Sequence, residues 1–331
     1  MKKWKLSKQA NITLVSVIAL SFLAVIVLHQ NPFANPRDEM IKKWIAGAIL
    51  LASLILYGAL YDKITVLPSE LYQNRRLIWK LSKNDFKTRF AGSYLGIVWA
   101  FIQPVVTILV YWVVFEKGLN AKAEMLADGT TAPYVLWLTA GLVPWFYFSE
   151  ALSNGTTALL EYNYLVKKVV FKISILPIIK IIAATFIHGF FVLFMLLLYM
   201  AHGYFPDAYT LQLFYYSFCL FVFVLGISYA TCAIVIFFRD LTHIIAIVLQ
   251  VGMWATPILW ALDRVPMEYQ IIFKLNPMFY IVNGYRSAML EKTWFWEDFY
   301  STMFFWIITA VIFGIGALIF KRLKIHFADV L

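Results

Sequence analysis

The chain carries few residues arranged for chemistry of their own. Its histidines number five and are scattered: His29, His188, His202, His243 and His326. They show no spacing typical of metal ligands, and no phosphate-binding P-loop, HExxH zinc motif or GxSxG nucleophile elbow occurs. The two cysteines, Cys219 and Cys232, lie in one apolar stretch without a CxxC pattern. The sequence therefore predicts no catalytic site, no metal site and no cofactor bound by this chain.

The most distinctive polar stretch is LNPMFYIVNGYR, residues 275–286, which interrupts an otherwise apolar region. Lys274 and Arg286 bracket it so closely that a helix between them rises about 16 Å, roughly half of a bilayer's hydrocarbon core. Proline suits the first turn of a helix and disfavours helix before it, so Asn276 and Pro277 predict a stop and a restart. We expect two short helices that enter the membrane from one face and return. A hairpin lying flat on the membrane surface is the alternative.

This stretch is also the candidate gate of a transport pathway, because non-helical backbone within a membrane survives only inside protein or beside a wet cavity. The candidate gate residues are Asn276, Pro277, Phe279, Tyr280, Tyr285 and Arg286. Aromatic rings can plug an empty route and offer their faces to sugars, and Gly284 allows a neighbouring backbone to approach. We expect Arg286 to snorkel to the surface or to pair with an acidic group such as Glu291. Contact with a substrate phosphate is a further possibility.

Composition places these residues in a membrane protein. The chain is 62% hydrophobic and 14% charged with a mean hydropathy of +0.77, against about 45–50% and 25% in soluble domains. Apolar runs recur along the whole length and predict about eight spans. These are residues 12–28, 44–61, 94–115, 134–152, 173–199, 211–238, 244–262 and 299–320. The first could be a cleaved signal peptide, but no small-residue cleavage site follows it. We therefore expect a retained hairpin over residues 1–62.

The distribution of basic residues predicts the orientation. An even number of spans puts both termini on one side of the membrane. With that side in the cytoplasm, the inner segments carry roughly twice as many lysines and arginines as the outer ones. We expect a multi-pass protein of the cytoplasmic membrane with both termini inside and residues 260–298 outside. The same bias accounts for the net charge of +10 without invoking nucleic acid.

A basic amphipathic helix is predicted within the cytoplasmic segment 63–93. Four basic residues fall on one face at helical spacing: Arg76, Lys80, Lys83 and Lys87. Leu77, Ile78 and Leu81 gather elsewhere on the same helix, a pattern typical of a helix lying in a membrane interface. A plain solvated linker is the alternative. The spans hold few carboxylates apart from Glu150, whereas ion-coupled transporters need buried ionisable groups. Any transport would therefore draw its energy from a partner.

Several short stretches, in order, carry a family resemblance. They are YLGIVWAFIQPVVTILVYWVVF at 94–115, APYVLWLTAGLVPWFYF at 132–148, NYLVKKVVFKISILP at 163–177, FFRDLTH at 237–243, LNPMFYIVNGYRSAML at 275–290 and the terminal FADVL. Together they resemble permease subunits of type-2 ABC exporters for bacterial surface polysaccharides and teichoic acids. The resemblance covers about residues 71–331 and leaves the N-terminal hairpin as an addition to the usual six spans.

The resemblance implies an all-α integral membrane protein with a six-span permease core over residues 94–331. It also implies a homodimer bound inside to two ATPase subunits, which hold ATP and Mg while this transport subunit has no enzymatic activity. The cargo would be a lipid-linked glycan or polyol-phosphate polymer. VYWVVF followed by Gly118 and Leu119, with APYVLWLTAG, looks closest to teichoic acid permeases. O-antigen and capsule permeases share most of these features.

Two rival functions remain at this point. A drug or lipid exporter of the same superfamily should lack the segment at 275–286. A membrane-embedded glycan-modifying enzyme would require a polar catalytic cluster at one membrane face, which the sequence does not offer. Tryptophans on the first two core spans are candidate pathway residues, because indole rings stack on sugars: Trp99, Trp112, Trp137 and Trp145. Aromatic belts at the membrane interfaces are the alternative explanation for them.

Two cytoplasmic segments complete the candidate sites. The loop after the second core span combines apolar anchors with a basic rim, a pattern that suits a groove of the ATPase. Its candidate coupling residues are Asn163, Leu165, Val166, Lys167, Lys168 and Phe171. Arg239 and Asp240 lie at a tight inner turn, where we expect the two charges to pair and close a helix end. A direct role in substrate contact is the alternative for this pair.

Overall fold

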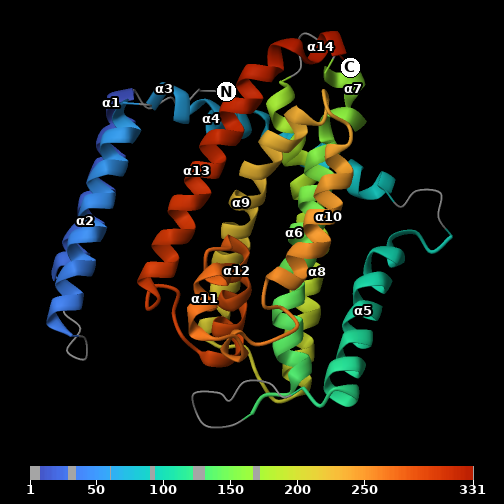
Figure 1. Ribbon diagram of the computed structural model, residues 1–331. Coiled ribbons are helices and arrows are strands. Elements are labelled where there is room, and N and C mark those ends of the chain that lie inside the picture. The colour runs from blue at the N-terminus through green and yellow to red at the C-terminus, as the bar shows by residue number, and fades with distance from the viewer. Residues whose placement is uncertain are drawn as a thin grey trace. The chain divides into compact units, whose positions relative to one another are not determined.

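The structure is a computed structural model that describes residues 8–28, 35–59, 61–89, 94–121, 131–166 and 172–330 (Figure 1). All the elements assigned within these ranges are helices, which confirms the expected all-α fold. The chain divides into two compact units, residues 1–75 and 76–331. Each unit is described by itself.

The first unit contains a hairpin of two long helices, α1 (Lys8–Leu28) and α2 (Pro36–Ala59). Lys43 of α2 donates a hydrogen bond of 3.2 Å to the carbonyl of Val27 in α1. A short helix, α3 (Tyr61–Ile64), follows, and α4 (Val66–Arg89) begins in this unit. Lys8 forms a 2.6 Å ion pair with Asp62, which ties the start of α1 to α3.

The second unit is a helical bundle. Its long helices are α5 (Trp99–Trp112) with the π-helix η2 (Val113–Gly118), α6 (Tyr134–Glu161), α8 (Leu176–Ala201), α9 (Gln212–Ile234), α10 (Leu241–Ala255) and α13 (Phe299–Leu323). Its short helices are η1 (Gly96–Val98), α7 (Asn163–Val166), η3 (Ile173–Ile175), η4 (Ala208–Leu211), η5 (Leu262–Arg264), α11 (Met267–Lys274), α12 (Pro277–Arg286), η6 (Ser287–Glu291), η7 (Lys324–His326) and α14 (Phe327–Val330).

Among the described residues, helices long and apolar enough to cross a membrane number six. They are Pro36–Ala59, Trp99–Gly118, Tyr134–Glu161, Ile173–Ala201, Ala208–Ile234 and Phe299–His326. The apolar helix α1, with 21 residues, lies outside this set. The expected span at 244–262 is corrected, because α10 has 15 residues and ends at Ala255. Pro257 is the physical reason: it disfavours helix before it, and Thr256 is extended at φ −98° and ψ 128°.

The core of the second unit is built around α6, which is buried along most of its length and packs against α8 and α9. A helix that is apolar all round needs neighbours on every side, and α6 fits that description. Helix α13 packs closely against α9. At this contact Gly226 of α9 faces the backbone of Phe313, and Gly316 of α13 faces the backbone of Gly226. Small residues allow this kind of approach between membrane helices.

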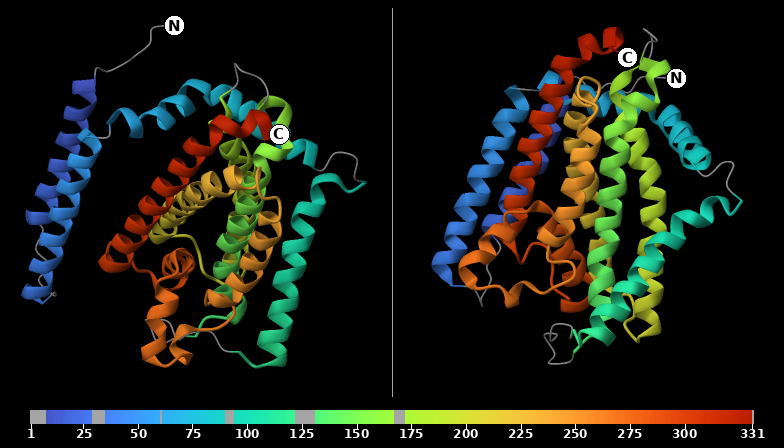
Figure 2. Two further views of the ribbon diagram at one scale, coloured as in Figure 1. Left: turned by 45° about the horizontal axis from the view of Figure 1, so that its top comes forward. Right: turned by 45° about the vertical axis from the view of Figure 1, so that its right-hand side comes forward.

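The bundle has two ends that differ in character (Figures 1 and 2). The part of α4 from Arg76 onward lies at one end with α7 and α14, and we call this the α4 end. At the opposite end α11 and α12 lie with the segment that follows α10, and we call this the α12 end. The candidate gate belongs to the α12 end, and the candidate coupling and interface residues belong to the α4 end.

Candidate functional site

The break after α10 is held by side chains from two other helices. The carbonyls of Pro257 and Ile258 accept hydrogen bonds of 2.7 and 2.9 Å from Arg286 of α12. The next carbonyl, of Leu259, accepts a 2.8 Å hydrogen bond from the hydroxyl of Tyr134 in α6. Three consecutive carbonyls outside a helix are therefore satisfied within the protein, which is the condition for irregular backbone at membrane depth.

Arg286 itself is buried, with 3% of its surface exposed. Its guanidinium lies 3.4 Å from the centre of the Trp137 ring, in cation–π geometry. A Cβ atom at Gly141 would come within 2.9 Å of Arg286 Nη2, so glycine makes room for the arginine on α6. The expectation that Arg286 snorkels to the surface is wrong. The carbonyls freed by the break after α10 supply acceptors inside the protein, and these offset the cost of burying the charge.

The expected restart at Asn276 and Pro277 is present. The Asn276 side chain accepts a 3.0 Å hydrogen bond from the backbone N–H of Met278 and so caps α12, while Pro277 is the first residue of the helix. The same side chain donates a 2.8 Å hydrogen bond to Thr256 Oγ1 in the break after α10. Asn276 and Arg286 thus hold α12 to that break at both ends of the helix.

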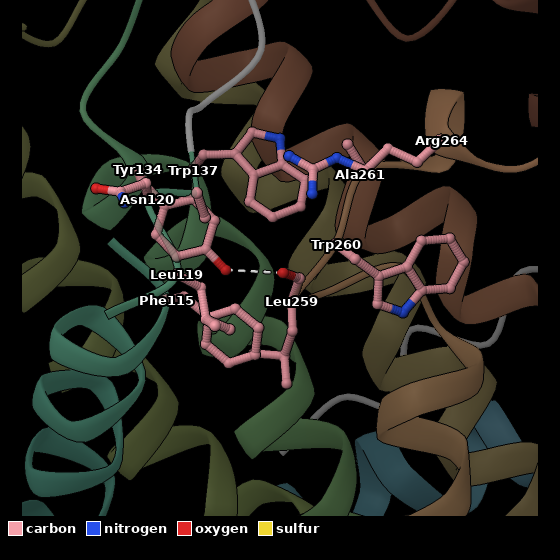
Figure 3. A pocket seen from close by; sticks show the side chains of 10 residues that line it. Phe115, Leu119, Asn120, Tyr134, Trp137, Leu259, Trp260, Ala261 and Arg264 are labelled. Atoms are coloured by element: carbon pink, nitrogen blue, oxygen red, sulfur yellow. Dashed lines mark hydrogen bonds between the residues drawn. The ribbon is translucent and has the colours of Figure 1, made fainter. Parts of the chain in front are cut away.

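A small pocket of about 150 Å³ lies beside this break (Figure 3). Its lining residues are Phe115, Leu119, Asn120, Ala121, Tyr134, Trp137, Leu259, Trp260, Ala261 and Arg264. The Tyr134 ring lies between those of Phe115 and Trp137, with centroid distances of 6.1 and 5.7 Å. Figure 3 shows the Arg264 side chain extending toward Trp137 and Trp260 standing opposite. Ring faces with a nearby cation and amide suit a sugar that carries an anionic group. We call this the α12-end pocket.

The tyrosines of the candidate gate point into the bundle. Tyr285 is fully buried, and its hydroxyl lies 2.6 Å from Ser217 Oγ and 3.0 Å from His188 Nε2. Tyr280 is also buried, with its hydroxyl 2.9 Å from Thr302 Oγ1. Phe279 is half-buried and lines, together with Tyr280, a separate cavity of about 340 Å³. The two tyrosine hydroxyls therefore anchor α12, and the structure brings Tyr280 but not Tyr285 to the wall of that cavity.

The four candidate pathway tryptophans are not brought together. Trp137 lines the α12-end pocket, whereas Trp145 is buried against Gly252 of α10, whose Cβ would lie 3.1 Å from the ring. Trp112 donates a 2.7 Å hydrogen bond to Glu116 within its own segment. Trp99 is 51% exposed and lines a cavity on the other side of α6. Only the positions of Trp137 and Trp99 therefore suit contact with a substrate.

The cavity beside Trp99 lies between α5, α6 and α8 and has a volume of about 430 Å³. We call it the side cavity. Arg89 and Glu150, which form an ion pair, lie on its wall, and so do Tyr147 and His188. Of its lining residues, sequence reasoning named Trp99 as a pathway candidate and noted Glu150 as a carboxylate within a predicted span, but it did not bring the two together.

A cluster of charges joins α4 to the bundle beside that cavity. Lys180 of α8 is buried and forms ion pairs of 2.6 Å with Asp85 and 2.5 Å with Glu161. Asp85 also accepts a 2.8 Å hydrogen bond from Tyr162 and lies 3.4 Å from Arg89. Burial, followed by the hydrogen bond to Asp85, raises the pKa of the Tyr162 hydroxyl, so it remains a donor. The signal in the sequence was Lys180, a lone charge within a predicted span.

Comparison with known proteins decides the family. Residues 76–290, more than half of the chain, match the family described as ABC-2 type transporter. The chain belongs to the ABC-2 type transporter family. The matched region starts in α4 and leaves out the hairpin of α1 and α2.

Individual members of the family are similar to this chain. It is 30% identical over 224 residues to the O-antigen export system permease protein RfbA of Myxococcus xanthus, covering 67% of this chain and 83% of that protein. It is 24% identical over 258 residues to an RfbA of Klebsiella pneumoniae, covering 77% and 95%. It is 24% identical over 216 residues to the polysialic acid transport protein KpsM of Escherichia coli, covering 62% and 78%.

The candidate coupling residues of this ABC-2 family member lie partly within α7. Asn163 is exposed, Leu165 is half-buried and Val166 is buried. Lys167, Lys168 and Phe171 lie outside the described residues. Tyr164, which sequence reasoning passed over, is 55% exposed. A partner approaching the α4 end would therefore meet Tyr164 and the edge of Leu165 before the buried Val166.

The four basic residues of α4, Arg76, Lys80, Lys83 and Lys87, are all exposed. Ile78, Ser82 and Asp85 form the buried face of the same helix. Trp79 and Phe86 reach Phe186 of α8 with ring-centroid distances of 5.3 and 5.6 Å, which fixes this part of α4 on the bundle. A role for the basic face at a membrane surface stays a prediction.

The inner turn differs from what we expected. Arg239 and Asp240 are both exposed, and no ion pair joins them in the part of the chain that the structure describes. The turn closes through backbone hydrogen bonds instead, from His243 to Asp240 at 3.0 Å and from Thr242 to Arg239 at 3.2 Å. The physical reason is that the carbonyls of Arg239 and Asp240 already accept hydrogen bonds from backbone N–H groups at the start of α10. The turn therefore needs no side-chain ion pair, and both charges remain exposed.

Proposed function

We propose that the chain is the transmembrane subunit of an ATP-driven exporter that moves a lipid-linked surface polysaccharide from the cytoplasmic to the outer side of the membrane. The α12-end pocket carries this proposal, because it combines the rings of Tyr134, Trp137 and Trp260 with Arg264. Rings and a cation suit a sugar polymer that carries acidic groups. The relatives named for O-antigen export and polysialic acid transport support the same class of cargo.

The α12 end faces outward in this proposal. Basic residues gather at the opposite end: Arg76, Lys80, Lys83, Lys87, Lys172, Arg239, Lys321, Arg322 and Lys324. The positive-inside rule supports a cytoplasmic position for that end and a place in the cytoplasmic membrane. The exit of the pathway then coincides with the α12-end pocket, and the side cavity opens nearer the cytoplasm.

Energy comes from two ATPase subunits, which hold ATP and Mg and dock at α7 and the neighbouring part of α4. The absence of a P-loop from this sequence supports a separate site for ATP. A second copy of this chain completes the pathway. The exposed apolar surface of the span Trp99–Gly118, of which 6% is buried, supports a partner helix on that side.

The cargo is a polysaccharide of the O-antigen or capsule class. The sequence motifs favoured teichoic acid, whereas the relatives favour polysaccharide export, and we give the relatives more weight because they match over most of the chain. A polyol phosphate remains a second candidate, since Arg264 at the pocket suits a phosphate as well as a carboxylate. A drug or lipid exporter fits less well, because the charged and ring-lined pocket suits a polar cargo.

Deletion of the gene tests the proposal. Cells without the permease should retain lipid-linked polymer in the cytoplasm and lose it from the surface, and the wild-type gene should restore export. Gel analysis of surface polysaccharide and assay of cell-wall phosphate identify which polymer is lost. The double variant Trp260→Ala and Arg264→Ala, at two pocket residues outside the Arg286 contact, should restore export poorly while still reaching the membrane. Normal amounts of every surface polymer in the deletion strain would overturn the proposed function.

A further inference from the structure

The side cavity is lined by polar groups that have no hydrogen-bond partner. The side chains of Gln103, Ser149, Ser153 and Asn154 make no hydrogen bond within the described residues. At the deep end His188 is 4% exposed, and its Nδ1 atom has no partner among those residues either. Buried polar atoms in native proteins are nearly always satisfied, so the unpartnered Nδ1 of the buried His188 indicates a ligand that reaches the deep end of the cavity. Gln103 and Ser153 are exposed and Ser149 and Asn154 half-buried, so their side chains are accessible to the polar groups of such a ligand.

Aromatic rings alternate with these polar groups on the cavity wall. Trp99 is half exposed at the entrance, with Phe146 and Phe191 farther along the wall. Tyr147 stacks on His188 with a centroid distance of 4.4 Å, and its hydroxyl lies 2.8 Å from Thr185 Oγ1. A wall of rings and amide or hydroxyl groups matches the two surfaces of a sugar, which has an apolar C–H face and a rim of hydroxyls.

The charge balance of the wall argues for a neutral ligand. Arg89 and Glu150 are the charged residues that line the cavity, and they are paired with each other. Arg89 also lies 3.4 Å from Asp85, so its charge is compensated twice. A phosphate would require an unpaired cation, which this lining does not supply.

We propose that the side cavity is a binding site for a neutral sugar unit of the exported polymer, held within one subunit between α5, α6 and α8. The proposal rests on the proposed function and adds a recognition site on the side of α6 away from the α12-end pocket. Gln103 and Asn154 would bond the sugar hydroxyls, and Trp99 would stack on its C–H face. At about 430 Å³ the cavity falls within the size range of small-molecule sites.

The site is joined by hydrogen bonds and ion pairs to both ends of the bundle. His188 Nε2 lies 3.0 Å from the hydroxyl of Tyr285 in α12. Arg89 reaches Asp85, whose 2.6 Å ion pair with Lys180 belongs to the charge cluster beside α7. A sugar in the cavity would therefore touch residues that position the α12 end and residues that position α4.

Glycan-dependent protection of single cysteines tests the site. We would place Ser153→Cys and Gln103→Cys in the full permease–ATPase complex and label membrane vesicles with N-ethylmaleimide without ATP. The native cysteines, Cys219 and Cys232, are fully buried, which keeps the background low. Vesicles would come from cells that make the whole lipid-linked polymer and from cells that lack the enzyme adding its first sugar. Asn84→Cys, exposed on α4 and outside the cavity, is the matched control.

Labelling of Ser153→Cys and Gln103→Cys should slow only in vesicles that contain the glycan. The rate falls by the factor 1 + [L]/Kd, about threefold when the ligand is at twice its Kd. Asn84→Cys should label equally in both preparations. Equal slow labelling of the cavity cysteines in both strains would indicate occupation by carrier lipid and overturn the proposal. Equal fast labelling in both strains would overturn it as well.

Failure of this inference can be told apart from failure of the proposed function. If the deletion strain loses surface polymer while the labelling rate of the cavity cysteines is the same with and without the glycan, the chain is an exporter and the side cavity is not a sugar site. If the deletion strain exports normally, the function itself is wrong. Replacing both Gln103 and Asn154 with alanine should abolish the glycan-dependent protection of Ser153→Cys. Unchanged protection in that variant would also count against the site.

Discussion

The guanidinium of Arg286 stacks 3.4 Å from the centre of the Trp137 ring while donating hydrogen bonds to the carbonyls of Pro257 and Ile258. One side chain therefore joins α6, α12 and the break after α10. A lysine keeps the charge but lacks the planar fork that reaches two carbonyls and lies flat on a ring. The α12 end is built on a contact that arginine alone among the natural residues can make.

Arg286→Lys should destabilise the protein by about 2–4 kcal/mol, because at least one buried carbonyl loses its donor and the ring contact is lost. The midpoint of thermal unfolding of the complex in nanodiscs measures the effect. Arg264→Lys, at an exposed arginine of the same end, is the matched control and should change the midpoint little. Equal midpoints for the two variants would show that the buried arginine is dispensable for stability.

Gly284 of α12 faces the ring of Tyr216, and a Cβ atom there would overlap that ring. Gly284→Ala should therefore cost about 1–3 kcal/mol through overpacking. Gly189→Ala in α8 meets nothing within 4 Å, so the same change there should be neutral or stabilise the helix by up to about 1 kcal/mol. Thermal midpoints of the two variants give the comparison. If Gly189→Ala lowered the thermal midpoint as much as Gly284→Ala, the packing argument would be contradicted.

Lys180 is the buried cation of the charge cluster, with Asp85 and Glu161 as its partners. Lys180→Met should destabilise by about 3–5 kcal/mol, because Asp85 keeps its buried charge and loses its ammonium partner. Adding Asp85→Leu should recover much of that loss, since an apolar pair replaces a broken ion pair. Glu161→Gln, on a half-exposed side chain, should have a small effect. A double variant no more stable than Lys180→Met would argue against direct coupling of the two residues.

Tyr164 and Leu165 present the accessible surface of α7. Changing both to aspartate should release the ATPase or uncouple its ATP hydrolysis from transport, because two carboxylates would replace the apolar contact. Tyr269→Asp is a matched control: both tyrosines are 55% exposed, but Tyr269 belongs to α11 at the other end. Co-purification of the ATPase and its turnover are the measurements. An intact complex with normal turnover in the α7 variant would remove α7 from the docking site.

Cysteines along α12 test the orientation and the gate together. Phe279→Cys and Asn283→Cys should react with an impermeant thiol reagent added to intact cells, because both residues are half-buried and line a cavity. Tyr285→Cys should react slowly, because Tyr285 is fully buried and does not line that cavity. A gate predicts that ATPase nucleotide binding changes this pattern. Reaction confined to inverted vesicles would reverse the orientation, and a pattern indifferent to nucleotide would exclude the gate.

Local features of the sequence predicted the elements well. Hydrophobic runs indicated the long helices, and the spacing of Arg76, Lys80 and Lys83 indicated the exposed face of α4. Asn276 and Pro277 predicted the start of α12, since capping and proline geometry act within a few residues. The early end of α10 could have been predicted from Pro257 in the same way. These features depend on neighbours along the chain.

The candidate site was less predictable because its contacts join distant parts of the chain. Arg286 was expected at the surface, yet its acceptors are carbonyls of Pro257 and Ile258 that become available only because α10 stops early. Tyr285 bonds to His188, 97 residues away, and no local pattern marks that pair. Burial of a polar residue depends on where its partner lies in space, which spacing along one helix does not reveal.

The ion pair between Asp85 and Lys180 also sets an order for biosynthesis. The two residues are 95 positions apart, so the ribosome adds α5, α6 and α7 before the partner of Asp85 exists. At about 5–20 residues per second, that interval lasts roughly 5 to 19 s. During this time Asp85 has no ammonium partner, and the contacts of α4 with Lys180 and Phe186 can form only after α8 enters the membrane. A nascent chain truncated before Lys180 should therefore leave α4 open to protease digestion, whereas one that includes all of α8 should protect it.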